Sequence, residues 1–132
     1  MGLIERILGI LQTKKPGDEK CWRHSTGKIE VAWARVPELQ KPCSAIRLEG
    51  RGLPDRVLLV YGIDGQFHAF KNRCTDMSTR LDPIPEKAAL RCHCLSRSTF
   101  DYFGNVIAGP AKEPLKTYPV ESHKCKMIIP LD

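Results

Sequence analysis

The sequence lacks the short motifs that mark the common classes of hydrolytic enzyme. It contains no recognisable Ser–His–acid pattern, no glycine-rich phosphate loop and no paired-carboxylate signature. Its basic residues are scattered along the chain, and no DNA- or RNA-reading motif accompanies them. We therefore expect neither a hydrolase nor a nucleic-acid-binding protein.

Long hydrophobic runs and signal-peptide features are also missing. The N-terminal stretch over residues 2–11 carries a Glu–Arg pair within its apolar run and has no cleavage-site pattern. It is far shorter than the roughly 20 apolar residues that a transmembrane helix needs. We therefore expect a cytoplasmic protein, in a reducing compartment where clustered cysteines are better explained as ligands than as disulfides.

Apolar residues near the N-terminus recur at helical spacing, which predicts an amphipathic helix over residues 1–15. The apolar face of this helix consists of Leu3, Ile4, Ile7, Leu8 and Leu11. Pro16-Gly17 ends the helix, and the polar residues 16–27 are predicted to form a linker. The helix would pack on its own domain or on a second copy. Because its tail is basic, contact with a membrane surface or a partner is the alternative.

The rest of the chain, residues 28–132, is predicted to be one all-β domain. The length of 132 residues suffices for one core, and 42% hydrophobic with 27% charged residues is ordinary for a globular protein. Asp64-Gly65 predicts a hairpin turn, and Phe103-Gly104-Asn105 predicts another. Strands are predicted at 28–36, 57–61, 66–70, 88–92, 99–102, 116–120 and 127–131. Short strands at this spacing favour an antiparallel sandwich or a small barrel.

Two loops, each beginning with a cysteine, carry the candidate chemistry, and six cysteines are many for a chain of this length. The first loop has the sequence Cys74-Thr75-Asp76-Met77-Ser78-Thr79-Arg80-Leu81, and the second has Cys92-His93-Cys94-Leu95-Ser96-Arg97-Ser98. Both loops follow predicted strands, so they can meet at one end of a sheet.

The two loops resemble the cluster-binding motifs of the Rieske iron–sulfur family, Cys-x-His-x-Gly followed by Cys-x-x-His-Gly. Cys74 and Cys92 stand at the two cysteine positions, with 15 residues between Asp76 and Cys92. The resemblance implies that these two cysteines are cluster ligands.

Other segments extend the resemblance to residues 28–131. Phe100-Asp101 followed by Gly104 is similar to the aromatic–Asp–turn–Gly hairpin of the family. Residues 107–115 are similar to the proline-containing loop that covers the cluster, with Gly109-Pro110 as the shield. The resemblance therefore implies a Rieske fold with a cluster-binding loop subdomain.

The function implied by the resemblance is that of a small ferredoxin-like electron carrier with a 2Fe-2S cluster. Such a protein passes single electrons between a reductase and a terminal oxygenase or reductase. It is an electron-transfer or accessory component rather than a catalyst by itself. The net charge of +6 would steer an acidic redox partner, although solubility alone also explains it.

The sequence departs from the family pattern at the ligand positions. In Rieske centres two cysteines hold one iron and two histidines hold the other. Asp76 stands at the first histidine position and Leu95 at the second, while Ser78 and Ser96 replace the two glycines. We therefore expect a changed ligand set and changed loops.

The residues that can supply a replacement ligand set are Cys74, Asp76, Cys92, His93 and Cys94. Three thiolates with Asp76 or His93 would make four ligands, and thiolate ligation would lower the reduction potential from the Rieske range toward roughly −400 mV. The same loops could instead hold one zinc or iron ion. In a third hypothesis the loops bind nothing, Leu95 fills the cluster volume, and the domain is a cluster-free interaction or regulatory module.

Cys94 has no partner for the disulfide found in the cytochrome bc branch of the family. The resemblance places Thr79 at the position of that partner cysteine. We therefore expect Cys94 to be a ligand, a redox-sensitive free thiol or a packed side chain.

A separate zinc site is a further hypothesis from the remaining cysteines and histidines. Cys21 and His24 lie in the predicted linker, and His123 and Cys125 lie near the last predicted strand. Each pair has a spacing that suits metal ligands, although neither contains a Cys-x-x-Cys knuckle.

Overall fold

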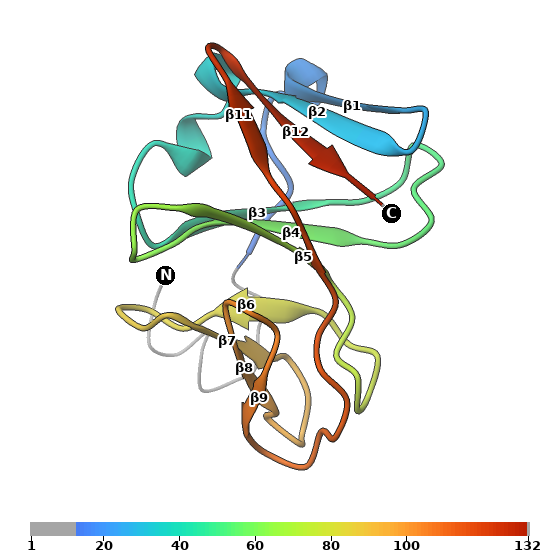
Figure 1. Cartoon of the computed structure of the whole chain (residues 1–132), viewed down its shortest axis with the longest axis vertical. Helices are drawn as coiled ribbons and strands as arrows, with labels where there is room; N and C mark the ends of the chain where they lie inside the picture. Colours follow the sequence, from blue (N-terminus) through green and yellow to red (C-terminus); the bar gives the residue numbers. More distant parts are fainter. Residues whose placement is uncertain (1–12, 132) are drawn as a thin grey trace.

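The structure, a computed structural model, describes residues 13–131 and is built from three four-stranded antiparallel sheets (Figure 1). The upper sheet has the order β1-β2-β12-β11, the middle sheet β10-β5-β4-β3 and the loop sheet β6-β7-β8-β9. The strands are β1 Trp22–Ser25, β2 Lys28–Ala32, β3 Ser44–Leu48, β4 Val57–Tyr61, β5 Phe67–Lys71, β6 Leu81–Pro83, β7 Ala89–Cys92, β8 Thr99–Asp101, β9 Val106–Ala108, β10 Thr117–Tyr118, β11 Glu121–His123 and β12 Lys126–Pro130. The all-β prediction is confirmed.

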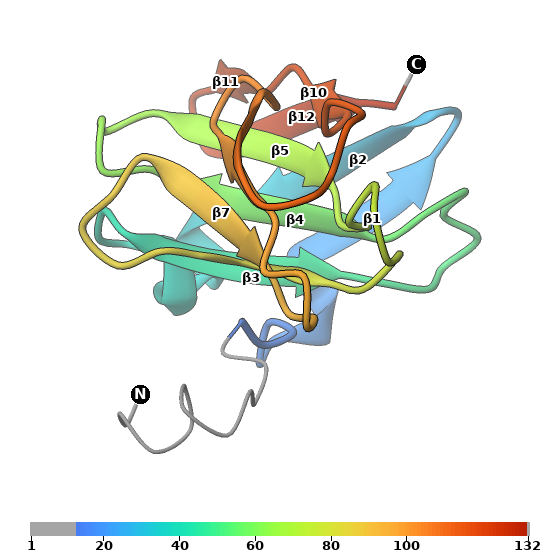
Figure 2. The same cartoon turned by 90° about the horizontal axis from the view of Figure 1, so that it is seen from below.

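The middle sheet is covered on both faces, which explains the continuous apolar run of β4. Val57 and Leu59 of this strand are buried in the core shared with the upper sheet. Leu58 and Val60 are buried in the lower core, between the middle sheet and the loop sheet, with Phe70 of β5 (Figure 1). Figure 2, seen from below, shows the loop sheet lying over the middle sheet. Each fully buried side chain stabilises the fold by roughly 1.5–3 kcal/mol.

Several predicted strands are confirmed, and others are shorter than predicted. β4 has the predicted bounds, and β5, β7, β8 and β12 lie within one residue of theirs. The strand predicted over 28–36 ends at Ala32, because the chain then forms a 3-10 helix, η2 (Trp33–Arg35). A second 3-10 helix, η3 (Pro37–Leu39), follows and has a proline as its first residue. The strand predicted over 116–120 is reduced to β10, since Pro119 follows it and cannot donate to a ladder.

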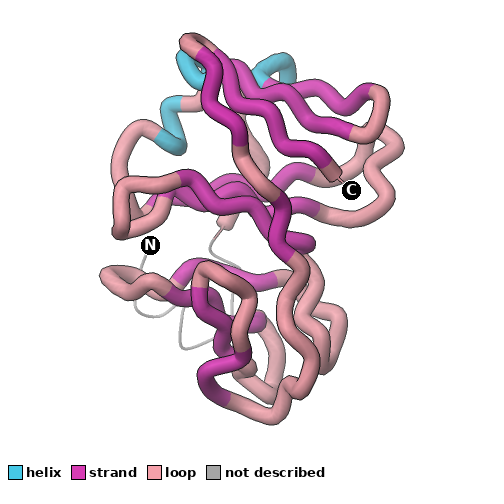
Figure 3. Tube along the Cα trace, viewed as in Figure 1, coloured by secondary structure: helices cyan, strands magenta, loops and turns pink. Residues whose placement is uncertain are grey.

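The linker prediction for residues 16–27 is wrong for its second half. Glu19–Cys21 forms a 3-10 helix, η1, and the residues that follow it form β1 of the upper sheet. Figure 3 shows the short helices in cyan and the strands in magenta. Trp22 is buried and pairs with Val31 of β2. The guanidinium of Arg51 lies 4.1 Å from the centre of the Trp22 ring. Burial of one large aromatic residue therefore draws a polar segment into the fold.

The N-terminal helix predicted over residues 1–15 lies for the most part outside the described residues. Its last three residues are described and are not helical. Lys14 forms a parallel bridge with Ile46 of β3, and the Thr13 amide donates to Asp82 Oδ1 at 2.9 Å. Within residues 13–131, no helix is long and apolar enough to cross a membrane.

The exposed face of the upper sheet is bound together by one carboxylate. Glu30 of β2 accepts from Lys126 of β12 at 3.0 Å and is paired with Arg23 of β1 at 2.6 Å. The hydrogen bond from Lys126, followed by that from Arg23, lowers the pKa of Glu30 to about 2. The Glu30 carboxylate therefore stays ionised at pH values well below those at which a glutamate usually becomes protonated.

Candidate metal centre

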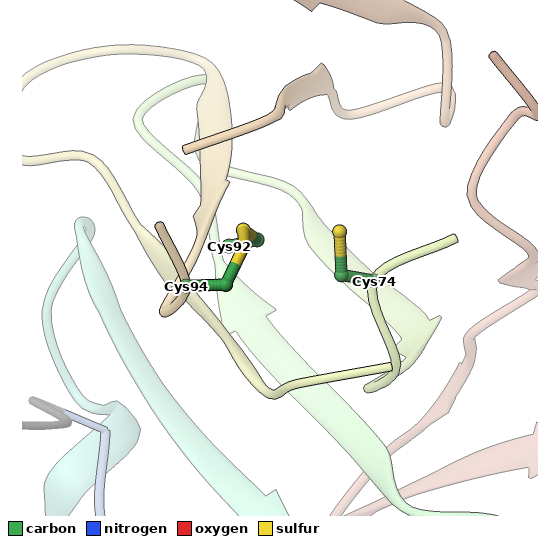
Figure 4. A group of neighbouring side chains, drawn as sticks. All are labelled: Cys74, Cys92 and Cys94. Carbon is green, nitrogen blue, oxygen red and sulfur yellow. A yellow bond between two sulfur atoms is a disulfide. The ribbon is translucent and has the colours of Figure 1, made fainter. Parts of the chain in front are cut away.

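Three cysteine sulfurs from the two predicted loops meet beside the end of β7 in the loop sheet (Figure 4). The Sγ atoms of Cys74, Cys92 and Cys94 all lie within 4.8 Å of one another. Cys74 begins the loop after β5, and Cys92 ends β7. Cys74 is 1% exposed and Cys92 3%, whereas Cys94 is half-buried. The loops therefore converge as the sequence predicts, around a largely buried group of sulfurs.

Cys92 and Cys94 are joined by a disulfide, which the sequence does not predict. Their Cα atoms are 5.4 Å apart, within the range that a disulfide spans. The loop turns sharply here, because the Arg97 amide donates to the Cys94 carbonyl at 3.2 Å and Arg97 has a φ of 52°. This turn brings the two side chains together, so Cys94 needs no partner on the first loop.

The first loop closes on itself in a tight turn that places Ser78 in a left-handed conformation. The Ser78 amide donates to the Cys74 carbonyl at 2.9 Å, and the Cys74 amide donates to the Thr79 carbonyl at 2.8 Å. Ser78 has a φ of 59°, in the left-handed region that glycine favours. Ser78 therefore occupies a backbone conformation that a glycine would adopt with less strain.

Side chains anchor the first loop to the middle sheet. Arg56 donates to the Asn72 carbonyl at 3.0 Å and to the Ser78 carbonyl at 2.9 Å. The buried Asn72 side chain accepts from the Leu81 amide at 2.8 Å and so fixes the start of β6. Both ends of the loop are therefore held by polar groups from residues that precede the cysteine.

A second anchor is an ion pair between Arg80 and Glu49, which follows β3. Arg80 Nε and Nη2 donate to the two carboxylate oxygens at 2.6 and 3.0 Å. The hydrogen bond from Arg80 lowers the pKa of Glu49, and the same bond raises the pKa of Arg80. This two-point pairing fixes orientation as well as distance.

A chain of serine hydroxyls links the sulfurs of the second loop to the proline-containing loop. Ser96 Oγ lies 3.0 Å from Cys94 Sγ and 3.4 Å from Cys92 Sγ. It also lies 3.2 Å from Ser98 Oγ, which accepts from the Ala111 amide at 3.0 Å. The motif comparison identified Ser96 only as the residue that replaces a glycine and gave Ser98 no role; their one further signal is the Ser-x-Ser spacing after the cysteines.

The proline-containing loop closes tightly over the second loop. Gly109 has a φ of 86°, and a Cβ at this position would lie 2.6 Å from the Ser98 Cα. Ala111 and Leu115 are buried with the cysteines in the lower core. Thr75 Oγ1 donates to the Glu113 carbonyl at 2.7 Å and ties this cover to the first loop. The inner face of the shield is therefore Ala111 and Leu115 rather than Gly109-Pro110, which are exposed.

The other predicted site residues lie away from the three sulfurs. Asp76 is exposed in the first loop, and among the described residues it does not join the group at metal-binding spacing. His93 has a side chain 28% exposed, with Nδ1 3.8 Å from Asp82 Oδ2. Leu95 is 95% exposed, so the prediction that it fills the cluster volume is wrong. The turn at Cys94 directs this side chain to solvent.

The separate zinc site predicted from Cys21, His24, His123 and Cys125 is not formed. His24 is on β1 and His123 on β11, which are the two opposite edges of the upper sheet. Strands lie roughly 4.8 Å apart, so these edges are separated by about 14 Å. Cys21 is buried, whereas Cys125 is exposed. In residues 13–131, the cysteine group described above is the one set with metal-binding geometry.

Several solved structures resemble this chain. The plasma membrane Rieske protein of the cyanobacterium Synechocystis is 25% identical, with a TM-score of 0.53, and the match covers 63% of this chain and 84% of that one. The ferredoxin of carbazole 1,9a-dioxygenase from Nocardioides aromaticivorans is 21% identical, with a TM-score of 0.59 over 70% of this chain and 88% of that one. A chain from a complex of reduced oxygenase and oxidized ferredoxin in carbazole 1,9a-dioxygenase is 17% identical, with a TM-score of 0.66 over 82% and 96%. The last two likenesses concern the fold alone.

The family comparison covers the middle sheet, both cysteine loops and the cover. No curated protein matches the sequence. The family model described as the Rieske [2Fe-2S] domain matches residues 31–119. The chain belongs to the Rieske [2Fe-2S] domain family.

Proposed function

We propose that the protein is a ferredoxin-like carrier of single electrons whose redox centre is held mainly by cysteine thiolates. The observation that carries this proposal is the meeting of Cys74, Cys92 and Cys94 within 4.8 Å of one another, in a chain of the Rieske [2Fe-2S] domain family. Packing of the lower core alone does not require three sulfurs from two separate loops to lie together, so their grouping favours a role as ligands. Thiolates are the protein ligands of iron–sulfur clusters.

The donor set fits a thiolate-bound iron–sulfur cluster but does not fit the usual Rieske centre. The usual centre needs two imidazoles, and the two histidine positions hold Asp76 and Leu95, both exposed. The three sulfurs supply three of the four donors that a 2Fe-2S cluster requires. When bound, such a cluster would accept and release one electron at a time.

We propose Asp76 as the fourth donor. It stands two residues after Cys74, at the ligand position of the first loop, and its exposed side chain would turn toward the sulfurs when the centre is bound. A carboxylate can ligate iron, although it is a harder donor than imidazole. His93 is the less suitable choice, because its ring lies against Asp82 of β6.

The surroundings would set a low potential and limit the access of water. Cys74 and Cys92 are buried, and the cover is tied to both loops by hydrogen bonds. The Ser96 hydroxyl lies within hydrogen-bonding distance of two of the sulfurs, and such bonds tune the potential. Thiolate ligation places the expected potential near roughly −400 mV, below the Rieske range.

The partner we propose is a redox protein with an acidic docking face, a reductase or a terminal oxygenase. The net charge of +6 supports this choice. Met77, Leu95 and Ile107 are exposed apolar side chains on the first loop, the second loop and β9. They would give a docking surface around the centre. One of the similar structures is described as a complex of oxygenase and ferredoxin, which supports a partner of this kind.

The experiment is a measurement of iron, acid-labile sulfide and zinc in protein purified without oxygen and with a reductant. We expect about two irons and two sulfides per chain, with visible absorption. Cys74→Ser and Cys92→Ser should each abolish the colour, and Asp76→Ala should weaken it. Cys125→Ser is the matched control, since Cys125 is free and exposed. A colourless protein without metal would contradict the proposal and favour a cluster-free interaction module.

A single metal ion is the second candidate, because the three sulfurs are so close together. Ligand sulfurs around one tetrahedral zinc ion lie about 3.8 Å apart, from Zn–S bonds of about 2.3 Å. Cys74 Sγ lies within 4.8 Å of the other two sulfurs, and those two can separate to this spacing once their disulfide is reduced. About one zinc or iron per chain without sulfide would favour this candidate over the cluster.

A further inference from the structure

We propose that the Cys92–Cys94 disulfide is a reversible lock on the metal centre: the disulfide prevents metal binding, and its reduction restores it. The inference rests on the proposed function, because the same two sulfurs are assigned there as ligands. A cysteine binds a metal as its thiolate, and a sulfur bound in a disulfide carries no thiolate charge. The oxidised chain therefore retains Cys74 as the single free thiol among the three sulfurs.

The lock opens by thiol–disulfide exchange with a dithiol. One thiolate of the dithiol attacks the Cys94 sulfur, forming a mixed disulfide and releasing the Cys92 thiolate. The second thiol of the reductant then attacks this mixed disulfide, which releases Cys94 and leaves the reductant as a cyclic disulfide. Two electrons and two protons pass from the dithiol to the protein, and a small-molecule disulfide such as oxidised glutathione reverses the reaction.

Burial selects the sulfur that is attacked. Cys94 is half-buried, whereas Cys92 is 3% exposed and Cys74 1%. An external thiolate therefore reaches Cys94 first, and Cys92 becomes the leaving group. Access to the attacked sulfur is one of the factors that set the rate of exchange.

Ser96 is the positioning residue of this reaction. Its hydroxyl lies 3.4 Å from Cys92 Sγ and 3.0 Å from Cys94 Sγ. It can donate to the thiolate that leaves, and a hydrogen bond to a charged group stabilises that charge. The neighbouring Ser98 hydroxyl, at 3.2 Å, lets Ser96 donate to sulfur while it accepts from its neighbour.

Cys74 gives the lock a direct connection to ligand binding. Its sulfur lies within 4.8 Å of both disulfide sulfurs and is buried beside them. Reduction therefore turns one thiol into three thiols at a single place, without movement of the first loop. Metal uptake should follow the redox state of the disulfide rather than a rearrangement of the fold.

The experiment measures the disulfide and metal uptake separately in the full chain. Protein is equilibrated with glutathione buffers from reduced to oxidised, alkylated, and weighed by mass spectrometry. We expect two more alkyl groups per chain after reduction, at Cys92 and Cys94. Each form is then mixed with zinc, and separately with ferrous iron and sulfide, and we expect uptake by the reduced form alone. Loss of uptake on oxidation should be reversed by dithiothreitol.

Two variants test the roles of the side chains. Ser96→Ala should slow reduction of the disulfide by roughly fivefold, the ratio that one hydrogen bond is worth. Ser122→Ala, at an exposed position of β11, is the matched control and should leave the rate unchanged. Cys43→Ser should remove one alkyl group from both forms, since Cys43 is free and exposed, and should leave the gain of two groups on reduction and the metal uptake unchanged.

The outcomes separate the lock from the proposed function. Free thiols at both positions throughout the oxidising buffers would overturn the lock, whatever the metal content. Equal metal uptake by both forms would also overturn it and would leave the electron carrier standing. A reversible disulfide with no uptake of zinc or iron by either form would overturn the metal centre and the lock together.

Discussion

Substitution of Ser98 by alanine should loosen the cover over the cysteines. Ser98 is fully buried, and its Oγ accepts from the Ala111 amide at 3.0 Å. Ser98→Ala leaves this buried N–H without its acceptor, which costs about 1–3 kcal/mol. The bond to Ser96 Oγ is lost as well. The backbone is spared, because Cys92 N still donates to the Ser98 carbonyl.

The assay is denaturant unfolding of the reduced, metal-free protein, so that neither a disulfide nor a metal contributes. We expect the unfolding free energy to fall by about 1–3 kcal/mol, equivalent to a loss of roughly 4–10 °C in Tm for a domain of this size. Alkylation of the buried Cys74 should also become faster. Ser122→Ala, an exposed serine of β11, should change stability by less than about 0.5 kcal/mol. A Ser98 variant as stable as this control would refute the reasoning.

Three further predictions test the ligand frame, the upper sheet and the cover. Asp76→His should raise the potential above roughly −400 mV, because a neutral imidazole would replace the anionic carboxylate ligand, measured by redox titration; an unchanged potential would contradict the assignment of residue 76 as a ligand. The pKa of Glu30 is lowered from 4.5 to about 2, so its stabilisation is complete above pH 4.5 and is lost as the pH falls toward 2. Unfolding of Glu30→Gln should therefore converge with that of the parent at low pH, and a constant difference would count against the ion pairs. Gly104→Ala should destabilise by more than about 1 kcal/mol, because Gly104 has a φ of 89° and a Cβ would collide with the Leu115 carbonyl; an unchanged Tm would show that this loop yields easily.

The fold could be predicted wherever one strong local signal controls the structure. The apolar run of β4 was found at its true bounds because both of its faces are buried. The hairpin after it follows from Asp64-Gly65, where Gly65 has a φ of 77°. By contrast, β6 and β9 have three residues each, too few to show a period. Trp22 gave no strand signal within a polar segment, since its burial depends on distant residues.

The site was predicted in its position but not in its details. The resemblance to the Rieske motifs located Cys74 and Cys92 on two loops that converge, because the two cysteines keep the positions that they have in those motifs. The exposure of Leu95 could not be foreseen, since it depends on the turn closed by the hydrogen bond between Arg97 and Cys94. The link from Ser96 to the cover likewise depends on a contact between two loops, in which the Ala111 amide donates to Ser98 Oγ.

The most direct test of the central claim is a redox titration of the reduced, iron-loaded protein, followed by visible absorption. The thiolate-bound carrier predicts a reversible one-electron transition near roughly −400 mV. The transition should be absent from Cys74→Ser and retained by Cys125→Ser. Absence of any transition in the parent protein, or a midpoint within the usual Rieske range of about −150 to +300 mV, would contradict the proposed centre.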